Sequence, residues 1–485
     1  MNALARILDW PGLPADGEAL ALWDAIALAR AVRGTANADF LVSGVEIDSR
    51  EVVPGDLFFA LKGEATDGHR FVENAYRAGA AAVVVERPVD GPHVLVNDTT
   101  AALVALGVAA RARTRARIVG VTGSVGKTSV KEALFASLDR SSRGAAHRSL
   151  KSYNNHVGVP LSLARMPVRS RFGIFEMGMN HAGEIAALTA QARPHVAVIT
   201  AIAPAHIEML GSEEAIAGAK AEIFAGLEPG GTAVIPADSP HFELLRDAAR
   251  ARADAVVSFG RSAHADVRLL DAVAAPGGGS LVTADLGDRR ICYTVAAPGD
   301  HWVINSLAVM AAVRASKGDL AAAGLALADM QGLAGRGARI AIAAHGGEAL
   351  LIDESYNANP ASMAATLAQL GQTAAGRRIA VLGAMKELGQ HGPGLHAALA
   401  APMRQARLDH AILVGEEMTA LAEELGKAAG ASLGKSLSFA HCADAEEALS
   451  ALRTFGLERD DAILVKGSNS VGLASLVAAL SRQEA

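Results

Sequence analysis

A short glycine-rich stretch between two apolar runs constrains the fold of this 485-residue chain more than any other feature. It reads T-G-S-V-G-K-T from Thr122 to Thr128, follows the strand-like run Ile118–Val121 and opens the helix-like run Val130–Leu138. Glycines let such a loop curl until its N–H groups and the helix N-terminus face phosphate oxygens. Lys127 then reaches the β- and γ-phosphates, and the Thr128 hydroxyl binds Mg²⁺. The residues expected to contact a nucleoside triphosphate here are Gly123, Ser124, Val125, Gly126, Lys127, Thr128 and Ser129.

Composition narrows the class of protein. Hydrophobic residues make up 51% and aromatic residues 4%, with alanine as the main filler, which favours a helix-rich α/β architecture. The net charge of −6 gives no reason to expect nucleic acid as a partner. Cys292 and Cys442 fit no C-x-x-C spacing and are expected to be core thiols in a reducing compartment. We find no secretion signal at residues 1–11 and no apolar run of the ~20 residues that a membrane span needs, so we expect a cytoplasmic protein.

The strand and helix patterns divide the chain into three blocks. Residues 1–113 alternate short apolar strands with helix-like runs. Residues 114–331 show the alternation of a parallel sheet wrapped by helices, followed by antiparallel strands. Residues 332–485 repeat strand–helix units typical of a smaller open α/β domain. The basic run at residues 111–117 is interpreted as a solvated helix end and linker in preference to a nucleic-acid site.

Three side chains of the central block follow apolar strands. Glu176 ends the strand Phe172–Phe175, where a carboxylate is suited to bind Mg²⁺ beside Thr128. His206 follows the next strand; a lone histidine is usually structural, but the shared sheet edge favours a place next to the metal. Lys220 lies on a predicted helix, and the residues alone favour a solvated lysine there.

Polar side chains also gather in loops elsewhere. Asn154 and Asn155 precede an apolar helix start and suit either a substrate or reacting phosphate, or a helix cap. In the third block, Arg336 is suited to grip a phosphate and Asp353 to accept hydrogen bonds from a ribose. The loops of this block hold more polar side chains than turn formation requires, which predicts substrate contacts. The side chains expected to make those contacts are Tyr356, Asn357, Asn359, Lys466 and Ser468.

Eight motifs, in one order along the chain, resemble those of the Mur ligase family. They are D-S-R-x-x-x-x-G-D-L-F-F-A-L (48–61), T-G-S-V-G-K-T (122–128), Y-N-N-x-x-G-x-P (153–160), E-M-G-M (176–179), A-H-I-E (205–208), A-K-x-E-I-F (219–224), D-E-S-Y-N-A-N-P (353–360) and V-K-G-S (465–468). Any one of them is modest evidence, but the shared order covers essentially the whole chain. The Y-N-A-N-P element favours the member that adds D-Ala-D-Ala, because the D-N-P-R motif of the member that adds the third residue is absent.

The resemblance implies a three-domain, ADP-forming ligase of cytoplasmic peptidoglycan precursor synthesis, with a central P-loop domain and a C-terminal Rossmann-like domain. The first domain, with Ser49 and Arg50, would bind the UDP end of UDP-MurNAc-tripeptide. The central domain would bind ATP and two Mg²⁺. The tripeptide carboxylate would be activated as an acyl phosphate and joined to D-Ala-D-Ala. By the same resemblance, Lys220 becomes a lysine carbamylated by CO₂, which replaces the solvated interpretation.

The resemblance also assigns the remaining roles. His301 and Asn305 match the family's adenine-side H-N-x-x-N element, although Trp302 stands where an asparagine is usual. The loop Gly383–Gly389 likewise departs from the family's G-D-M-x-E-L-G. Arg336 and Asp353 join the nucleotide contacts. The catalytic residues implied are Lys127, His206, Lys220 and Arg336, and the metal ligands implied are Thr128, Glu176, His206 and Lys220.

Other classes share parts of this pattern. A folylpolyglutamate-synthase-like or cyanophycin-synthetase-like ligase has the central motifs, but the D-S-R…G-D-L-F-F-A-L element argues against both. A ligase that adds the third residue of the peptide is a further alternative. A nucleotide-driven switch would not need the polar strand ends of the third block. The chain is expected to act as a monomer.

Overall fold

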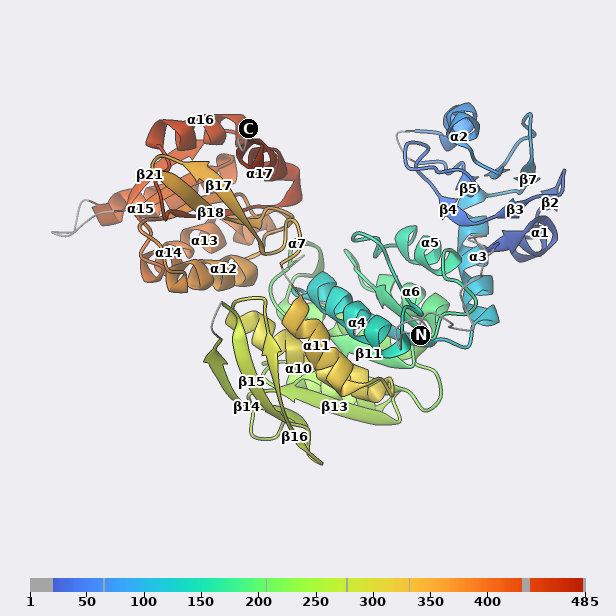
Figure 1. Ribbon diagram of the computed structural model, residues 1–485, viewed down its shortest axis with the longest axis horizontal. Helices are drawn as coiled ribbons and strands as arrows, with labels where there is room; N and C mark the ends of the chain where they lie inside the picture. Colours follow the sequence, from blue (N-terminus) through green and yellow to red (C-terminus); the bar gives the residue numbers. More distant parts are fainter. Residues whose placement is uncertain are drawn as a thin grey trace, which may run out of the picture. The chain divides into compact units, whose positions relative to one another are not determined.

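The computed structural model describes residues 21–63, 66–205, 207–275, 278–330, 332–429 and 437–482. These residues form two compact units, which are coloured along the sequence in Figure 1. The first unit combines residues up to 116 with residues 147–171, and the second combines residues 117–146 with those from 172 onward. The segment 147–171, which the sequence pattern grouped with the central block, therefore packs with the first unit. The domain boundaries at 113/114 and 331/332 stay a prediction.

The first unit is a small parallel sheet with helices. Its elements are β1 (Trp23–Asp24), α1 (Ala25–Val32), β2 (Thr35–Ala36), β3 (Leu41–Val42), β4 (Gly44–Glu46), β5 (Asp56–Phe59), η2 (Gly68–Phe71), α2 (Val72–Ala78), β6 (Ala82–Val85), β7 (His93–Leu95), α3 (Thr99–Arg113) and α5 (Gly158–Ala164). The sheet order is β2-β7-β6-β5-β4; β2 is antiparallel to β7 and the other pairs are parallel. The Trp23 indole N–H donates to Ala164 O at 3.2 Å, which ties the later segment to the start of the unit.

The basic run at the end of α3 is less solvated than the sequence suggested. Arg111 is buried, and the Arg113 guanidinium lies 3.5 Å from the centroid of the Trp23 ring. Arg113 also donates to Leu22 O at 2.8 Å. The expectation of a solvated helix end is therefore wrong for these two arginines, and the partners of Arg113 come from a segment about ninety residues earlier.

The second unit begins with the central domain. Its elements are β8 (Arg117–Thr122), α4 (Lys127–Ser142), β10 (Phe172–Glu176), α6 (Glu184–Ala192), β11 (Val196–Ile199), α7 (Ile207–Leu210), α8 (Glu213–Ala221), η3 (Glu222–Gly226), β12 (Thr232–Pro236), α9 (Phe242–Arg250), β13 (Ala255–Gly260), β14 (Val267–Ala274), β15 (Ser280–Asp285), β16 (Arg290–Val295), α10 (Asp300–Ala315) and α11 (Leu320–Asp329). The sheet runs β16-β15-β14-β13-β12-β11-β8-β10, with β9 (Ala146–Arg148) straddling the boundary between the units. Strands β10 to β14 and β8 pair in parallel, and β15 and β16 are antiparallel additions, as predicted.

Alternate residues of β8 show how this sheet is covered. Val119 and Val121 belong to a core cluster that also contains buried residues of α4, α10 and α11. Those three helices lie over one face of the sheet in Figure 1. Because parallel strands end at one edge, β8, β10 and β11 deliver their following loops to the same place.

The third domain is doubly wound. Its elements are β17 (Ala338–Ala344), β18 (Gly347–Glu354), α12 (Pro360–Gln372), β19 (Arg378–Gly383), η4 (Gly389–His391), α13 (Gly392–Ala397), α14 (Ala400–Gln405), β20 (His410–Val414), η5 (Glu416–Met418), α15 (Thr419–Ala429), β21 (Ser438–Cys442), α16 (Ala445–Phe455), β22 (Ala462–Lys466), η6 (Asn469–Val471) and α17 (Leu473–Ser481). The sheet order is β17-β18-β22-β19-β20-β21. In β19, Ala380 and Leu382 pack with α12 and α14, whereas Ile379 and Val381 pack with α16 and α17. Helices therefore cover both faces.

The structure also bears on the expectations about the two cysteines and about membrane-spanning helices. Cys442 is buried, but Cys292 is exposed, so the expected core position is wrong for Cys292. The reason is its place on β16, the edge strand of the antiparallel extension. Among the residues that the structure describes, no helix is long and apolar enough to cross a membrane.

Candidate active site

The loop between β8 and α4 has the backbone that its sequence predicts. Gly123 and Gly126 take φ angles of 149° and 84°. A Cβ on Gly123 would lie 2.0 Å from Thr200 Oγ1, and a Cβ on Gly126 would lie 3.1 Å from Asn305 Oδ1. Only glycine fits both positions, and the first N–H groups of α4 open directly behind the loop.

Thr200, which follows β11, supports this loop and was not singled out from the sequence. Its hydroxyl donates to Val125 O at 2.5 Å. Beside it, the Ser124 N–H donates to Ala201 O at 2.7 Å. Thr200 directly follows the buried strand β11, and this position of a polar residue could have identified it from the sequence, as it did for Glu176. The neighbouring strand thus holds the loop in shape.

The Lys127 side chain is half-buried, and its ammonium donates to Gly123 O at 2.7 Å. Burial lowers the pKa of Lys127; the charges of Glu176 and Glu387 oppose that shift, and the charge of Arg336 adds to it. Arg336 and Glu387 belong to the third domain. Charged groups of both domains in the second unit therefore act on the ammonium at the phosphate loop.

The two oxygen ligands predicted for Mg²⁺ lie together. The Thr128 hydroxyl donates to Glu176 Oε2 at 2.7 Å, and both side chains are buried. Hard oxygen donors of this kind suit Mg²⁺. His206, also predicted at this place, lies outside the described residues. Within the described residues, no group of three His, Cys, Asp or Glu side chains is arranged to hold a metal.

Lys220 on α8 is buried, with 1% of its surface exposed. The residue-based interpretation of a solvated lysine is wrong, because α8 turns this position inward. Burial lowers the pKa of Lys220 well below its ordinary value, and the charge of Lys127 lowers it further. Both effects favour the neutral amine at this position.

The start of α10 contributes the predicted adenine-side residues. Asn305 lies against Gly126 of the phosphate loop, and burial lowers the pKa of His301. Trp302, which replaces the usual asparagine, is buried in the core cluster of the central domain. The tryptophan therefore packs the domain instead of offering an amide.

The predicted third-domain residues converge on the turn before β17. The Arg336 guanidinium lies 4.2 Å from the centroid of the Tyr356 ring. Asp353 is buried, and its Oδ2 accepts from the Gly335 N–H at 2.7 Å while Oδ1 accepts from the Ser355 hydroxyl at 2.6 Å. Asp353 thus fixes the backbone beside Arg336.

The remaining polar residues of this domain also hold local structure. Asn359 Oδ1 caps α12 by accepting from the Ser362 N–H at 2.9 Å. The Lys466 ammonium donates to Asn357 O at 2.9 Å and lies 3.2 Å from Glu354 Oε2. Ser468 Oγ accepts from the Lys386 N–H at 2.9 Å. These side chains support the carboxyl edge of the sheet, a role that the sequence did not separate from substrate contact.

The first unit holds the other predicted residues. Arg50 pairs with Asp48 at 2.6 Å, and this hydrogen bonding lowers the pKa of Asp48 to about 2. Ser49 lies between them in the same turn. Asn155 Oδ1 accepts from the Gly158 N–H at 2.9 Å and so caps the start of α5, while Asn154 is half-buried beside it.

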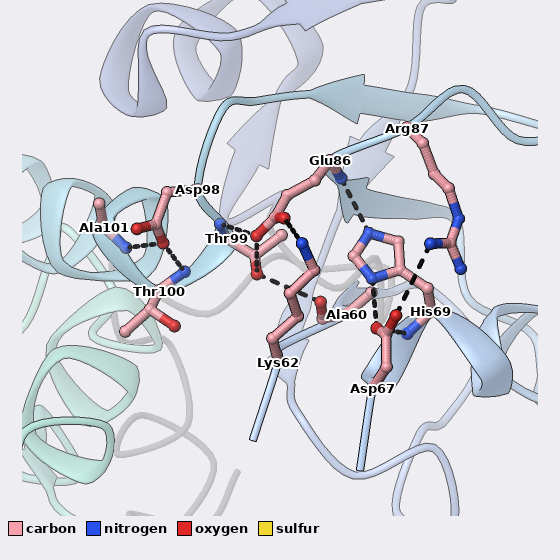
Figure 2. Close-up of polar contacts among 10 residues, drawn as sticks. All are labelled: Ala60, Lys62, Asp67, His69, Glu86, Arg87, Asp98, Thr99, Thr100 and Ala101. Atoms are coloured by element: carbon pink, nitrogen blue, oxygen red, sulfur yellow. Dashed lines mark hydrogen bonds and ion pairs between the residues drawn. The ribbon is translucent and has the colours of Figure 1, made fainter. Parts of the chain in front are cut away.

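A polar network at the start of α3 fixes the loop after β5 (Figure 2). Glu86 accepts from the Thr99 N–H at 3.0 Å and pairs with Lys62. The His69 ring accepts from the Glu86 N–H at 2.9 Å through Nε2 and lies 2.6 Å from Asp67 through Nδ1. The sequence did not mark these residues, and their polar groups are satisfied within the unit.

The second unit therefore has a glycine-rich anion loop with a buried oxygen pair for a divalent cation at its base. A buried lysine that favours its neutral form and an arginine of the third domain lie near enough for their charges to interact with Lys127 of that loop. Phosphoryl transfer needs positioning and charge neutralisation more than it needs a protein nucleophile. The arrangement is suited to that chemistry.

The sequence matches three family models in chain order. Residues 41–94 match the Mur ligase family catalytic domain, residues 121–313 the Mur ligase middle domain, and residues 338–469 the Mur ligase glutamate ligase domain. The chain is similar to the UDP-N-acetylmuramoyl-tripeptide--D-alanyl-D-alanine ligase of Synechocystis sp., with 37% identity over 453 residues, 91% of this chain and 92% of the relative. The Escherichia coli ligase of the same name is 33% identical over 446 residues, 91% of this chain and 94% of the relative.

Solved structures show the same likeness. A crystal structure of MurF from Acinetobacter baumannii superposes with a TM-score of 0.80 at 30% identity, covering 95% of this chain and 98% of that chain. The structure of MurF ligase from Thermotoga maritima in complex with ADP gives a TM-score of 0.73 at 26% identity, covering 91% and 97%.

Proposed function

This chain belongs to the Mur ligase family, and on that premise we propose that it is an ATP-dependent, ADP-forming ligase that joins D-alanyl-D-alanine to UDP-MurNAc-tripeptide. The observation that carries the proposal is the phosphate loop with the Thr128–Glu176 pair at its base, in a chain whose relatives share this named reaction. The reaction belongs to peptidoglycan precursor synthesis. We place it in the cytoplasm, where ATP is available, and assign it to a monomer.

The first step brings two anions together. The terminal carboxylate of the tripeptide attacks the γ-phosphorus of ATP, the bond to ADP breaks, and an acyl phosphate forms. Lys127 and Arg336 neutralise the repulsion between the carboxylate and the phosphate oxygens. Arg336 of the third domain lies near enough for its charge to act on the Lys127 ammonium, which supports this role.

In the second step the amine of D-Ala-D-Ala attacks the acyl carbon. A tetrahedral intermediate forms and collapses as phosphate leaves, and the nitrogen loses its extra protons to give the amide. Because acyl phosphates hydrolyse, the site must exclude water while the amine arrives. Residues of the third domain, including Tyr356, Asn357 and Asn359, are proposed to close over the substrates.

The residues present fit Mg²⁺ and a carbamylated lysine. Thr128 and Glu176 would hold the ion, with His206 and Lys220 as further ligands. Bound Mg²⁺ neutralises charge on the phosphate oxygens. At Lys220, the neutral amine that burial favours can bond to the carbon of CO₂ and lose a proton, which gives an anionic carboxylate.

The other predicted residues are assigned to the substrates. Asn305 and His301 would contact the adenine side of ATP, and Asp353 its ribose. The residues proposed for the UDP-linked peptide and the acceptor are Ser49, Arg50, Asn154, Asn155, Lys466 and Ser468.

A substrate panel tests the proposal. UDP-MurNAc-tripeptides are offered with D-Ala-D-Ala or with single amino acids, and products are detected by mass. The expected product carries D-Ala-D-Ala and appears with one ADP per ligation. Addition of a single diamino acid would identify a ligase that adds the third residue. Nucleotide turnover that does not depend on either acceptor would overturn the ligase assignment.

A further inference from the structure

The Thr200 side chain holds two carbonyl groups at the phosphate loop. Thr200 is buried, with 2% of its surface exposed. Its hydroxyl donates to Val125 O at 2.5 Å and lies 3.3 Å from Thr122 O, which also accepts from the Thr200 N–H at 2.9 Å. Both carbonyls therefore point out of the loop, toward the segment that follows β11.

The direction of the Val125 carbonyl decides what the loop offers to an anion. A trans peptide group points its C=O and its N–H in opposite directions. Since Val125 O faces Thr200, the Gly126 N–H of the same peptide group points away from Thr200, to the side on which a phosphate would bind. Gly126 has a φ of 84°, and glycine lets a neighbouring peptide group rotate at little steric cost. A rotated group would present Val125 O, the negative end of its dipole, to the phosphates.

Ser124 makes a second set of contacts with the same segment. Its N–H donates to Ala201 O at 2.7 Å, and its hydroxyl donates to Ala203 O at 2.9 Å. The side chain is buried, and both donors of the residue are engaged by protein carbonyls. Ser124 would have to break these bonds in order to donate to a phosphate oxygen.

Lys127 gives a reason why the loop needs support from outside. Its ammonium donates to Gly123 O at 2.7 Å and to Ser124 O at 3.4 Å. When the ammonium turns to the phosphates of ATP, these two carbonyls lose that donor. The hydrogen bonds from residues 200–203 involve no group that must move to bind ATP, so they keep the loop in shape at that moment.

We infer that Thr200 and Ser124 are positioning residues for the nucleotide. They hold the backbone of the phosphate loop so that its N–H groups face the phosphates, and neither side chain contacts ATP. Thr200 has the larger role, because its hydroxyl fixes the peptide group next to Gly126. The inference rests on the proposed use of ATP.

The variant Thr200→Val tests this inference, since it keeps the branched shape of the side chain and removes the hydroxyl. The affinity for ADP with Mg²⁺, measured by calorimetry, is expected to fall about 10- to 100-fold, because Val125 O loses its donor. The affinity for adenosine, which has no phosphate, is measured by ligand-observed NMR and should stay within twofold. KM for ATP should rise, whereas KM for UDP-MurNAc-tripeptide and for D-Ala-D-Ala should not. Thr200→Ser, which restores the hydroxyl, should recover most of the ADP affinity.

Thr189→Val is the matched control for the loss of a buried hydroxyl. Thr189 on α6 is also buried in the central domain, and its hydroxyl donates to a backbone carbonyl, Ile223 O, at 2.9 Å. Both threonine variants should lower the melting temperature by similar amounts, but only Thr200→Val should weaken ADP binding. Unchanged ADP affinity in Thr200→Val would overturn the inference, as would an equal loss in Thr189→Val or an equal loss for adenosine.

A double variant tests whether Ser124 acts through the same backbone. Ser124→Ala alone should weaken ADP binding by a smaller factor than Thr200→Val. When the two changes are combined, the loss should be less than the product of the single losses, because both loosen one loop. Losses that multiply would overturn the assignment of Ser124 and indicate a direct contact with the phosphates. A wild-type protein that binds no ADP would contradict the proposed function itself.

Discussion

The phosphate loop and the third-domain sheet edge build their parts of the site in different ways. The loop is one contiguous segment, and its shape depends on glycine backbone angles at Gly123 and Gly126. The third-domain edge draws side chains from three separated segments, and several of them form hydrogen bonds with the local backbone. Asp353 and Asn359 each accept from a neighbouring backbone N–H.

This difference predicts which substitutions change activity alone and which change both activity and stability. Lys127 donates only to carbonyls of its own loop among the hydrogen bonds described, so its loss should change chemistry and leave folding intact. Asp353 is buried and holds a turn, so its loss should change both. The predictions below run from the largest expected effect to the smallest.

The largest effect is expected at the loop. Lys127→Ala should lower the ligation rate by about 10²- to 10³-fold, because the γ-phosphate keeps its negative field toward the incoming carboxylate. The melting temperature should stay within two degrees or so. Steady-state ADP release and calorimetry measure the two quantities, with the exposed Lys427→Ala as a control. A rate within twofold of wild type would remove the loop from the mechanism.

A substitution of Lys220 tests whether this buried side chain of the central domain serves catalysis, as Lys127 is expected to, or only packing. Lys220→Ala should lose about 10²-fold in rate, since a ligand of the metal would be missing. Short-chain carboxylic acids should restore part of the activity by occupying the vacated volume. Full activity without such acids would mean that burial of this lysine serves packing alone.

The variant Asp353→Asn tests the third-domain sheet edge, where one side chain is expected to affect both stability and activity. The amide replaces an acceptor oxygen with a donor that faces N–H or O–H groups, which should destabilise the third domain by about 1–3 kcal/mol. Activity should fall about tenfold, because the turn that carries Arg336 loosens. Urea unfolding and kinetics are measured together, with exposed Asp460→Asn as control. A loss of activity with unchanged stability would show that the carboxylate contacts substrate directly.

The smallest effect on activity is expected in the first unit, outside both regions, where a substitution should change only the pH dependence of stability. Burial lowers the pKa of His147 to about 4, against about 6.5 in the unfolded chain. Between these values the unfolded chain binds more protons, so this contribution is fully present above pH 6.5 and is lost as pH falls toward 4. Lowering the pH from 7 to 5 should cost the wild type about 2 kcal/mol more than His147→Gln.

Urea titrations at the two pH values measure this difference. Histidines common to both proteins cancel, and exposed His264→Gln should behave as the wild type. An equal pH response in wild type and His147→Gln would show that the ring is solvated in the folded unit.

The parts of the site that the sequence revealed are those whose causes are local. The phosphate loop consists of adjacent residues, so its motif is visible in the sequence. Glu176 is recognisable because it is a polar residue at the end of an apolar strand. The sheets were predicted because buried parallel strands are continuous apolar runs, as in β11.

The other site residues could not be predicted, because their burial and their partners depend on segments that are distant in sequence. Lys220 lies between two alanines, and nothing nearby in sequence shows that this face of α8 is buried. Arg113 packs on Trp23, and Glu387 is held by His396 and Ser468 through the residues before it. Such partners are set by tertiary structure, so their positions could not be deduced from spacing.

The return of residues 147–171 to the first unit has a consequence for synthesis on the ribosome. Trp23 bonds to Ala164, 141 positions later, and α3 packs on α5. At typical elongation rates, a nascent chain waits several seconds between the emergence of residue 116 and that of residue 171. During that interval β8 and α4 emerge from the ribosome while the N-terminal unit still lacks its last helix. The face of α3 around Gly107, which lies against Pro160 in the folded unit, therefore stays uncovered until the second segment arrives.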